Sequence, residues 1–473
     1  MENLLLNAWS TVGSVVLAIL ILLVMITIHE FGHYIAGKLL GFRIDEFSIG
    51  FGPALFKRRS KKTGELFALR LIPLGGYCAF AGEDGLDDET DTKQEEGEED
   101  GPKKNGDGKK QSASEPFPQF QEDGAQPKPS DADHASAANV PSADGALEAH
   151  KRDESVAQPS VQTCVGGASE EGNLSEKDKE APVRTGGEFT KMAPWKRIIV
   201  LIAGAFMNYV LAVFLLIVCF FAYGQTMIAV YKAEPTAEIP AQYCLQDYDI
   251  LLEAQGKKLY LTTDVAQALN GHKAGDLVEV RISRVVGTKE DGTYLREEMD
   301  VRIALRADVD VRNSADLDGV WRALGIAYET EGESGVWQLA NASYRFGFWE
   351  TLGRSFAYSF KIAGSIFKVL GELLTGRLGI SALGGPLTTI SVTSQIAGRS
   401  FRGFLEIAGF LGVNLAVFNL LPIPALDGSK VVFTVIEWIR KKPLNRKVEA
   451  IIHAVGFVLL LGFAVLVDIL QFV

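Results

Sequence analysis

The sequence predicts a polytopic α-helical membrane protein with about four transmembrane helices, a membrane-associated β-hairpin region and one extracytoplasmic α/β domain. Three observations predict this fold class. Four stretches of the 473-residue chain are apolar over the roughly 20 residues that a helix needs to cross a bilayer core. Strand patterns punctuated by glycine and proline follow the first stretch. Strand and helix patterns alternate between the second and third stretches.

The four apolar stretches differ in length and continuity. Their approximate bounds are Val12–Leu40, Ile198–Tyr223, Phe404–Leu421 and Ile451–Phe472. Pro422 and Pro424 interrupt the third stretch near its end, because proline breaks a helix. A further apolar stretch, Phe346–Leu374, carries charges at regular intervals, so we expect an amphipathic or interfacial helix there rather than a span. Those charges are Arg354, Lys361, Lys368 and Glu372.

Basic residues set the orientation of the spans. Lysine and arginine cluster after the first span (43–62), before the second (191–197) and between the third and fourth (430–447). With four spans, all of these clusters fall on one side, which the positive-inside rule makes cytoplasmic. The N-terminus, residues 225–400 and the C-terminus are then expected on the outer side.

Composition shifts along the chain predict its organisation. We expect a first transmembrane helix over 1–41, a membrane-associated β region over 42–82, a disordered acidic cytoplasmic insert over 83–190, a second transmembrane helix over 191–225, the outer domain over 226–308, a connecting region with an amphipathic helix over 309–400, a third transmembrane helix over 401–428, and a cytoplasmic loop with the fourth transmembrane helix over 429–473. The insert is low-complexity and too polar to bury a core. It supplies much of the net charge of -12, which gives no reason to expect nucleic-acid binding.

The first span contains a His-Glu-Phe-Gly-His motif over residues 29–33. His29 and His33 are four apart, so on a helix they share one face and can bind one Zn²⁺. Glu30 can act as a general base on water at the metal. Ionisable groups at membrane depth usually mark function, so the motif points to hydrolysis within or at the edge of a bilayer. The alternative is a chance pair of structural histidines.

A catalytic zinc usually takes three protein ligands and leaves one position open. Asp427 is the candidate for the third ligand, because it follows a proline-broken helix near the cytoplasmic end of the third span. Its expected depth matches that of His29 and His33. The alternative is a simple cap, since Leu-Asp-Gly is also a turn signal. The four cysteines are widely spaced and predict neither a disulfide framework nor a cysteine zinc site.

The β region over 42–82 lies next to the metal motif in the sequence. Its strand patterns cover residues 47–53 and 67–77, and the second contains Gly75 and Gly76. An exposed strand edge there could pair with an unwound substrate segment, which makes both glycines candidate substrate-binding positions. The alternative is an ordinary hairpin packed on the membrane face.

The paired motifs, His-Glu-Phe-Gly-His and Asn-Leu-Leu-Pro-Ile-Pro-Ala-Leu-Asp-Gly over 419–428, resemble the site-2 protease family of intramembrane zinc metalloproteases. The bacterial branch with an extracytoplasmic PDZ domain, of the regulator of sigma-factor protease type, is most similar. The resemblance covers residues 7–81 and 189–472. It implies that His29, His33 and Asp427 bind Zn²⁺ and that Glu30 activates water.

The resemblance also implies a cellular role. It implies a multi-pass protein of the bacterial inner membrane that takes part in regulated intramembrane proteolysis. Its partners would be the lipid bilayer and single-span membrane substrates, such as anti-sigma factors and remnant signal peptides already trimmed outside. No nucleic-acid partner is expected, and the resemblance leaves the oligomeric state open.

Other segments carry weaker marks of the same family. Gly204 and Asn208 match its Gly-x-x-x-Asn element, and residues 384–386 resemble a segment before its third core span. Asn419 corresponds to an asparagine thought to hold the substrate backbone near the metal, and Asn208 is a second candidate for substrate binding. The alternatives are close helix packing at Gly204 and interhelical hydrogen bonds at both asparagines.

Residues 226–308 resemble a PDZ domain loosely. The family usually has Gly-Leu-x-x-Gly-Asp where this chain has Cys244-Leu-Gln-Asp-Tyr248-Asp249, so both glycines are absent. We still expect the PDZ-like fold. Without the two glycines the domain is less suited to bind a peptide in a groove, and it can instead act as a size filter over the active site.

Two rival functions of the whole protein are a membrane scaffold with a degenerate site and a metal permease. The intact Glu30 argues against the first, and the absence of an evident internal repeat argues against the second.

Overall fold

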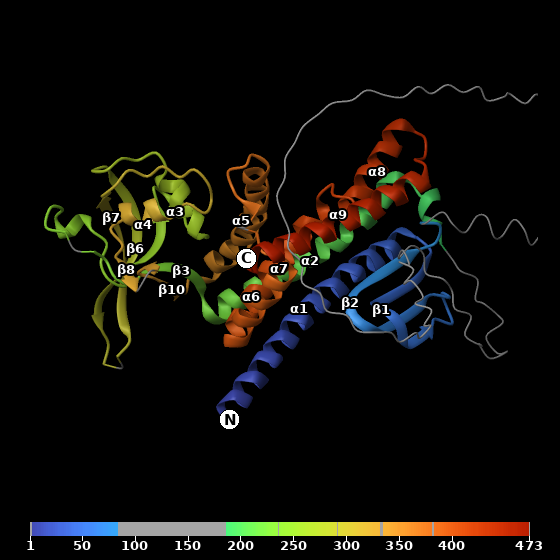
Figure 1. Cartoon of the computed structure of the whole chain (residues 1–473), viewed down its shortest axis with the longest axis horizontal. Coiled ribbons are helices and arrows are strands. Elements are labelled where there is room, and N and C mark those ends of the chain that lie inside the picture. Colours follow the sequence, from blue (N-terminus) through green and yellow to red (C-terminus); the bar gives the residue numbers. More distant parts are fainter. Residues whose placement is uncertain are drawn as a thin grey trace, which may run out of the picture. The chain divides into compact units, whose positions relative to one another are not determined.

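The computed structural model describes residues 2–83 and 186–472, apart from residues 235, 291, 332–333 and 381–382. Residues 84–185, where the disordered insert is predicted, lie outside the described part. Among the described residues, four helices are long and apolar enough to cross a membrane (Figure 1). They are α1 (Glu2–Leu40), α2 (Pro194–Tyr223), α7 (Phe401–Leu420) and α9 (Arg446–Phe472). The predicted multi-pass membrane architecture is therefore confirmed.

Helix α2 is the centre of the helical part and packs against both α1 and α7. Small residues allow these helices to approach closely, as is usual within membranes. A Cβ at Gly412 of α7 would lie only 2.9 Å from the Cβ of Ala212 on α2. Glycine at position 412 therefore permits the tight contact between α2 and α7.

A buried ion pair joins the start of α2 to α8 (Asp427–Arg440). Arg197 Nη1 lies 2.7 Å from Glu437 Oε2, and both side chains are at least nine-tenths buried. Burial raises the pKa of Glu437, but hydrogen bonds from the Leu444 amide and from Arg197 outweigh it, and the net pKa is lowered. This contribution to stability is present above the ordinary glutamate pKa and is lost as the pH falls through the lowered value.

Arg197→Met is expected to destabilise the protein by up to about 3–5 kcal/mol, because Glu437 loses its buried partner and keeps only the more exposed Arg446 as an ion-pair partner. Unfolding of the purified protein in mixed micelles measures the change. Lys232→Met is the control, because it breaks the exposed Lys232–Glu329 pair, which should contribute little. Equal stability of the two variants would contradict the assigned importance of the buried pair.

Strands β1 (Ile44–Arg59) and β2 (Leu66–Phe80) form an antiparallel two-stranded sheet. Both are longer than the strand patterns predict, because pairing continues through register shifts near Gly50 and Gly52, which have positive φ angles. The distal half of the hairpin exposes apolar side chains. These are Phe51, Leu55, Phe56, Leu69, Leu71 and Ile72. The exposed apolar surface is consistent with the predicted membrane-associated β region.

The second described part of the chain begins at Gly186 and packs at once against the β region. Gly187 bridges to Phe42, and a short 3₁₀ helix, η4 (Phe189–Lys191), follows. Phe189 is 4% exposed and contacts the rings of Phe42 and Phe80. The boundary predicted at residue 190 was therefore wrong, since residues 186–190 are folded through the buried Phe189.

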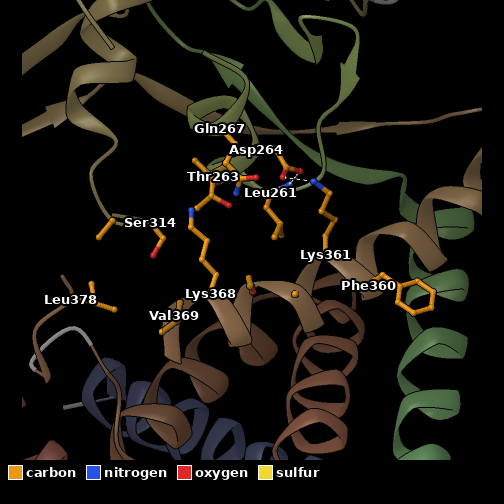
Figure 2. Close-up of a pocket in the computed structure, with 14 residues that line it drawn as sticks. Leu261, Thr263, Asp264, Gln267, Ser314, Phe360, Lys361, Lys368, Val369 and Leu378 are labelled. Atoms are coloured by element: carbon orange, nitrogen blue, oxygen red, sulfur yellow. Dashed lines mark hydrogen bonds and ion pairs between the residues drawn. The ribbon is translucent and has the colours of Figure 1, made fainter. Parts of the chain in front are cut away.

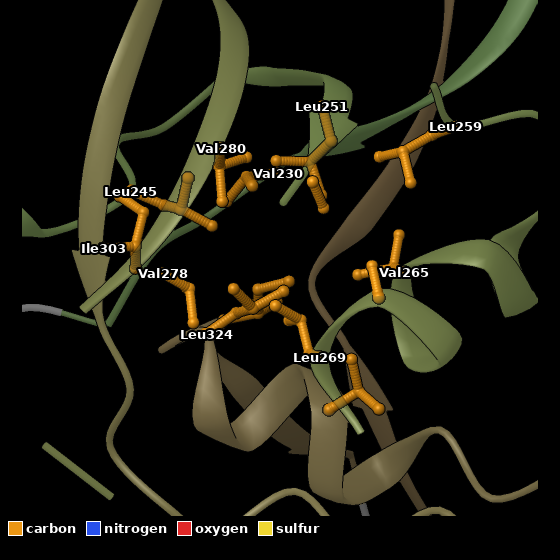
Figure 3. Close-up of a cluster of buried hydrophobic side chains, with 14 of the residues drawn as sticks. Val230, Leu245, Leu251, Leu259, Val265, Leu269, Val278, Val280, Ile303 and Leu324 are labelled. Carbon is orange, nitrogen blue, oxygen red and sulfur yellow. The ribbon is translucent and has the colours of Figure 1, made fainter. Parts of the chain in front are cut away.

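The domain expected on the outer side of the membrane, called the outer domain below, contains a sheet with the order β10-β3-β4-β6-β7, in which β5 also pairs with β4. The elements are β3 (Gln225–Val230), η5 (Ala241–Tyr243), β4 (Ile250–Ala254), β5 (Lys257–Lys258), α3 (Thr262–Leu269), β6 (Leu277–Thr288), β7 (Tyr294–Ala304), α4 (Asp318–Ala323), β8 (Tyr328–Glu331), β9 (Ser334–Trp337) and β10 (Leu339–Tyr344). The core in Figure 3 lies between the sheet and the helices, with Leu251, Val278 and Leu269 among its members. The alternating strand and helix patterns predicted between the second and third spans are confirmed.

The outer domain extends beyond Asp308, where its predicted boundary falls. Strand β10 pairs with β3, and Val320, Trp321 and Ile326 belong to the same buried core. Residues 309–344 therefore complete this domain instead of connecting it to the membrane. The predicted boundary was too early because the sequence does not show that the last strand, β10, pairs with the first strand, β3.

Tyr248 occupies the position of a glycine that is absent from the PDZ-like motif. Its φ angle is +66°, in the left-handed region that glycine adopts without strain. The next residue, Asp249, is fully buried and binds Arg284, with an Oδ2–Nη2 distance of 2.6 Å. The local backbone thus keeps a glycine-like turn even though the glycine is missing.

Helix α5 (Phe348–Leu374) is amphipathic, as predicted. Its charged residues contact the outer domain: Arg354 donates to the Leu259 carbonyl, and Lys361 lies 2.8 Å from Asp264. Figure 2 shows Lys361 and Lys368 facing α3 across a cavity of about 610 Å³. The regular charge spacing therefore reflects contact with the outer domain, and no residue of the histidine motif lines this cavity.

Candidate metal centre

Helix α1 carries the histidine motif on the face that packs against α2. His29 and His33 are 7% and 6% exposed. The two helices cross at Gly32, where a Cβ would lie 2.4 Å from the Ala203 carbonyl oxygen. This close crossing holds both imidazoles against the α2 backbone.

Gly204 provides the space beside the two imidazoles. A Cβ at this position would lie 2.4 Å from His33 Nε2 and 2.7 Å from His29 Cε1. Close helix packing was the alternative interpretation of Gly204. The structure shows such packing, and the groups packed against Gly204 are the two candidate metal ligands, His29 and His33.

The backbone of α2 also orients His33. Its Nδ1 lies 2.8 Å from the Val200 carbonyl oxygen, which can only accept, so Nδ1 carries the proton. The unprotonated Nε2 is then directed toward His29 and available as a ligand, in the arrangement common for metal-binding histidines.

Asp427 reaches the histidines because the third span breaks. Helix α7 ends at Leu420, and α8 begins at Asp427. The Asp427 Oδ2 atom lies 2.8 Å from His29 Nε2 and 3.2 Å from His33 Nε2. Asp427 thus lies at the depth that the sequence predicts, at the first residue of a helix.

The three donor atoms fit a zinc ion. The two Nε2 atoms are 3.1 Å apart, which makes all separations close to the roughly 3.3 Å edge of a tetrahedron with zinc–nitrogen bonds near 2.0 Å. Two imidazoles and one carboxylate also suit zinc chemically. Among the described residues, His29, His33 and Asp427 form the cluster able to hold a metal ion.

Strand β2 passes over Glu30. A Cβ at Gly76 would lie 3.3 Å from Glu30 Cγ, and the neighbouring Gly75 has a φ angle of +109°. Cys78 follows on the same strand, and burial together with the nearby Glu30 charge raises the pKa of its thiol.

Asn208 and Asn419 both reach the far side of His29. Their Nδ2 atoms lie 3.4 Å and 3.3 Å from His29 Nδ1, which are long distances for a hydrogen bond. Asn208 is fully buried, and its Oδ1 has no hydrogen-bond partner among the described residues. The structure therefore contains the interhelical contacts that were the alternative interpretation, and substrate binding by either amide stays a prediction.

Several residues that contact the site were not predicted from the sequence. The Val200 carbonyl and the Gly32 crossing depend on how α1 and α2 pack. A third contributor, His453, accepts a hydrogen bond from the Ala425 amide in the loop before Asp427. Its signal was a histidine within an apolar span, which is uncommon and often functional.

Two buried histidines on an apolar helix, with a partly buried aspartate and a glutamate beside them, define a membrane-embedded metal-dependent hydrolase. The family model described as peptidase family M50 matches residues 17–463, and the chain belongs to this family. The family resemblance found in the sequence is thereby confirmed.

Curated relatives agree with this assignment. The zinc metalloprotease RasP of Bacillus licheniformis is 26% identical, with 95% of this chain and 96% of the relative covered. The regulator of sigma-W protease RasP of Bacillus subtilis is 28% identical, with 95% and 96% covered. The chain is therefore a zinc metalloprotease, and the scaffold and permease alternatives are not supported.

Proposed function

We propose that this protein hydrolyses peptide bonds in single-span membrane proteins, with zinc bound by His29, His33 and Asp427. The observation that carries the proposal is the zinc-sized separation of the donor atoms of two buried histidines and the partly buried Asp427, where α1 packs against α2 and α8 begins. A peptidase site in this position reaches substrates that lie in the bilayer.

The catalytic roles follow from the residues around the donors. Zinc supplies a Lewis acid that polarises the scissile carbonyl and makes water more acidic. Glu30 takes the proton of the attacking water and delivers it to the leaving amine. His33 is held in its ligating tautomer by Val200. An amide oxygen of Asn208 or Asn419 turned toward His29 Nδ1 would accept its proton and keep Nε2 free as a ligand. We also assign to Asn419 a contact with the substrate backbone.

Strand β2 offers a way to present the substrate. A helical peptide bond is protected by its own hydrogen bonds, so the substrate must unwind before hydrolysis. Gly76 lies on the strand that passes Glu30 and has no side chain of its own to block an approaching backbone, whereas the Phe51 ring packs against Gly75. We propose that an extended substrate segment pairs with this strand edge.

The topology and substrates complete the proposal. We place the protein in the bacterial inner membrane, with the PDZ-like domain extracytoplasmic and acting as a size filter. Substrates are single-span proteins trimmed outside, including anti-sigma factors and remnant signal peptides. The name of the Bacillus subtilis relative, regulator of sigma-W protease, supports the first class.

Reconstitution in proteoliposomes tests the proposed substrate class. Two tagged single-span substrates should be compared, one with its outer domain intact and one trimmed to a few outer residues. The trimmed substrate should be cleaved faster, and a zinc chelator should stop cleavage. Equal cleavage of both substrates would contradict the size filter, whereas cleavage that resists chelation would contradict zinc catalysis.

A further inference from the structure

Helix α9 contacts the rest of the protein sparsely. Only 6% of its most apolar stretch is buried within the protein. Most of its large apolar side chains are exposed, as expected for a helix that faces lipid. Polar side chains toward both of its ends nevertheless contact other elements. Arg446 and His453 do so near the start, and Asp468 and Gln471 near the end.

His453 contacts the loop that precedes Asp427. Its Nδ1 accepts a hydrogen bond from the Ala425 amide at 3.0 Å, so its proton resides on Nε2. Its ring packs edge-on against Phe433 of α8, with a centroid distance of 5.6 Å. His453 therefore touches both the loop before Asp427 and the helix that begins there.

The loop itself is in an unfavourable conformation. Ala425 has a φ angle of +78°, which is uncommon for a residue with a side chain and needs support from surrounding contacts. Residue 427 comes only two positions later, so a change at Ala425 moves the carboxylate. The hydrogen bond to His453 supplies support at the strained residue.

Gly456 supplies a second contact one helical turn further along α9. A Cβ at Gly456 would lie 2.2 Å from the Cβ of Pro424. Together, His453 and Gly456 form the contact surface of α9 for Pro424 and Ala425. The close approach at Gly456 sets the distance between α9 and the loop, and the hydrogen bond from the Ala425 amide to His453 sets the orientation of the loop backbone.

Asp468 anchors the other end of α9. It accepts hydrogen bonds from the amides of Leu387 at 3.0 Å and Thr388 at 3.3 Å, at the start of α6 (Pro386–Arg399). This contact fixes α9 without touching the loop before Asp427. It offers an internal comparison for the role of His453.

We propose that His453 is a positioning residue for the metal site, acting through the Ala425 backbone to hold Asp427 beside the two histidines. The inference rests on the proposed function, in which Asp427 is a zinc ligand. It assigns to the lipid-facing α9 a direct part in shaping the metal site.

Metal binding by purified full-length variants tests the proposal independently of proteolysis. His453→Leu removes the acceptor, whereas His453→Asn can keep an acceptor oxygen near the position of Nδ1. We expect His453→Leu to weaken zinc affinity about 10- to 100-fold, as is typical for loss of a group that orients a ligand. His453→Asn should restore most of this loss. The visible spectrum of the cobalt(II)-substituted protein should change in the leucine variant only.

Control variants separate this role from general loosening of α9. Asp468→Leu breaks the other anchor and should leave zinc affinity and the cobalt spectrum unchanged. Gly456→Ala displaces Pro424 and should weaken zinc binding like His453→Leu, which gives a second route if the leucine variant folds poorly. Wild-type zinc affinity in both His453→Leu and Gly456→Ala would overturn the proposal. An equal loss of zinc affinity in Asp468→Leu would overturn it as well.

Asp427→Ala distinguishes failure of the inference from failure of the proposed function. Loss of zinc in Asp427→Ala with normal binding in the His453 and Gly456 variants would reject only the positioning role. Normal zinc binding in Asp427→Ala would reject the ligand assignment, and the positioning role with it.

Discussion

Glu30→Gln is expected to reduce proteolysis by at least about 10²- to 10⁴-fold, the usual contribution of a general base. The amide is nearly the same size as the carboxylate but cannot take a proton from water. The ligands His29, His33 and Asp427 are untouched, so zinc content should stay at wild-type level. Cleavage of a reconstituted substrate and metal analysis of the same sample measure both quantities.

Glu30→Asp provides the matched control for charge. It keeps a carboxylate but withdraws it by one methylene, so activity should be reduced yet remain above that of Glu30→Gln. Unchanged cleavage by Glu30→Gln would show that another group takes the proton. Loss of zinc in that variant would instead assign Glu30 to metal binding.

Gly204→Ala is expected to remove both zinc and activity. The new methyl group would lie 2.4 Å from His33 Nε2, where real Cβ atoms do not approach, so an imidazole or α2 must move. Either movement separates donor atoms that now stand 2.8–3.2 Å apart. Zinc content should fall from about one ion per chain to near none, as measured by metal analysis after desalting.

Gly462→Ala is the control for glycine substitution within a span. No atom lies within 4 Å of its added Cβ, so zinc content and activity should match the wild type. Zinc retention in Gly204→Ala would contradict the packing assigned to the α1–α2 crossing. An equal loss in the control would indicate a general effect of alanine in these helices.

The sequence predicted the parts of this protein that depend on local pattern. A long apolar run predicts a span wherever it packs, because the bilayer sets the required length. His29 and His33 share a face because helix geometry alone fixes an i, i+4 pair. Asp427 could be proposed because prolines break the preceding helix and zinc usually needs a third ligand.

The sequence did not predict features that depend on distant contacts. Helix α6 carries many small and polar residues and shows no strong apolar pattern, and its start is capped by Asp468 from α9. The outer domain extends past Asp308 because β10 pairs with β3, far earlier in the chain. The contacts of Val200 and His453 also arise only when separate helices come together.

The position of the cleaved bond tests the central claim most directly. A purified single-span substrate should be cleaved in proteoliposomes, and mass spectrometry of both products should locate the scissile bond. The account predicts a bond inside the apolar span of the substrate, with no such products from Glu30→Gln. Cleavage confined to the water-exposed flanks, or the same products from Glu30→Gln, would contradict hydrolysis within the membrane by this site.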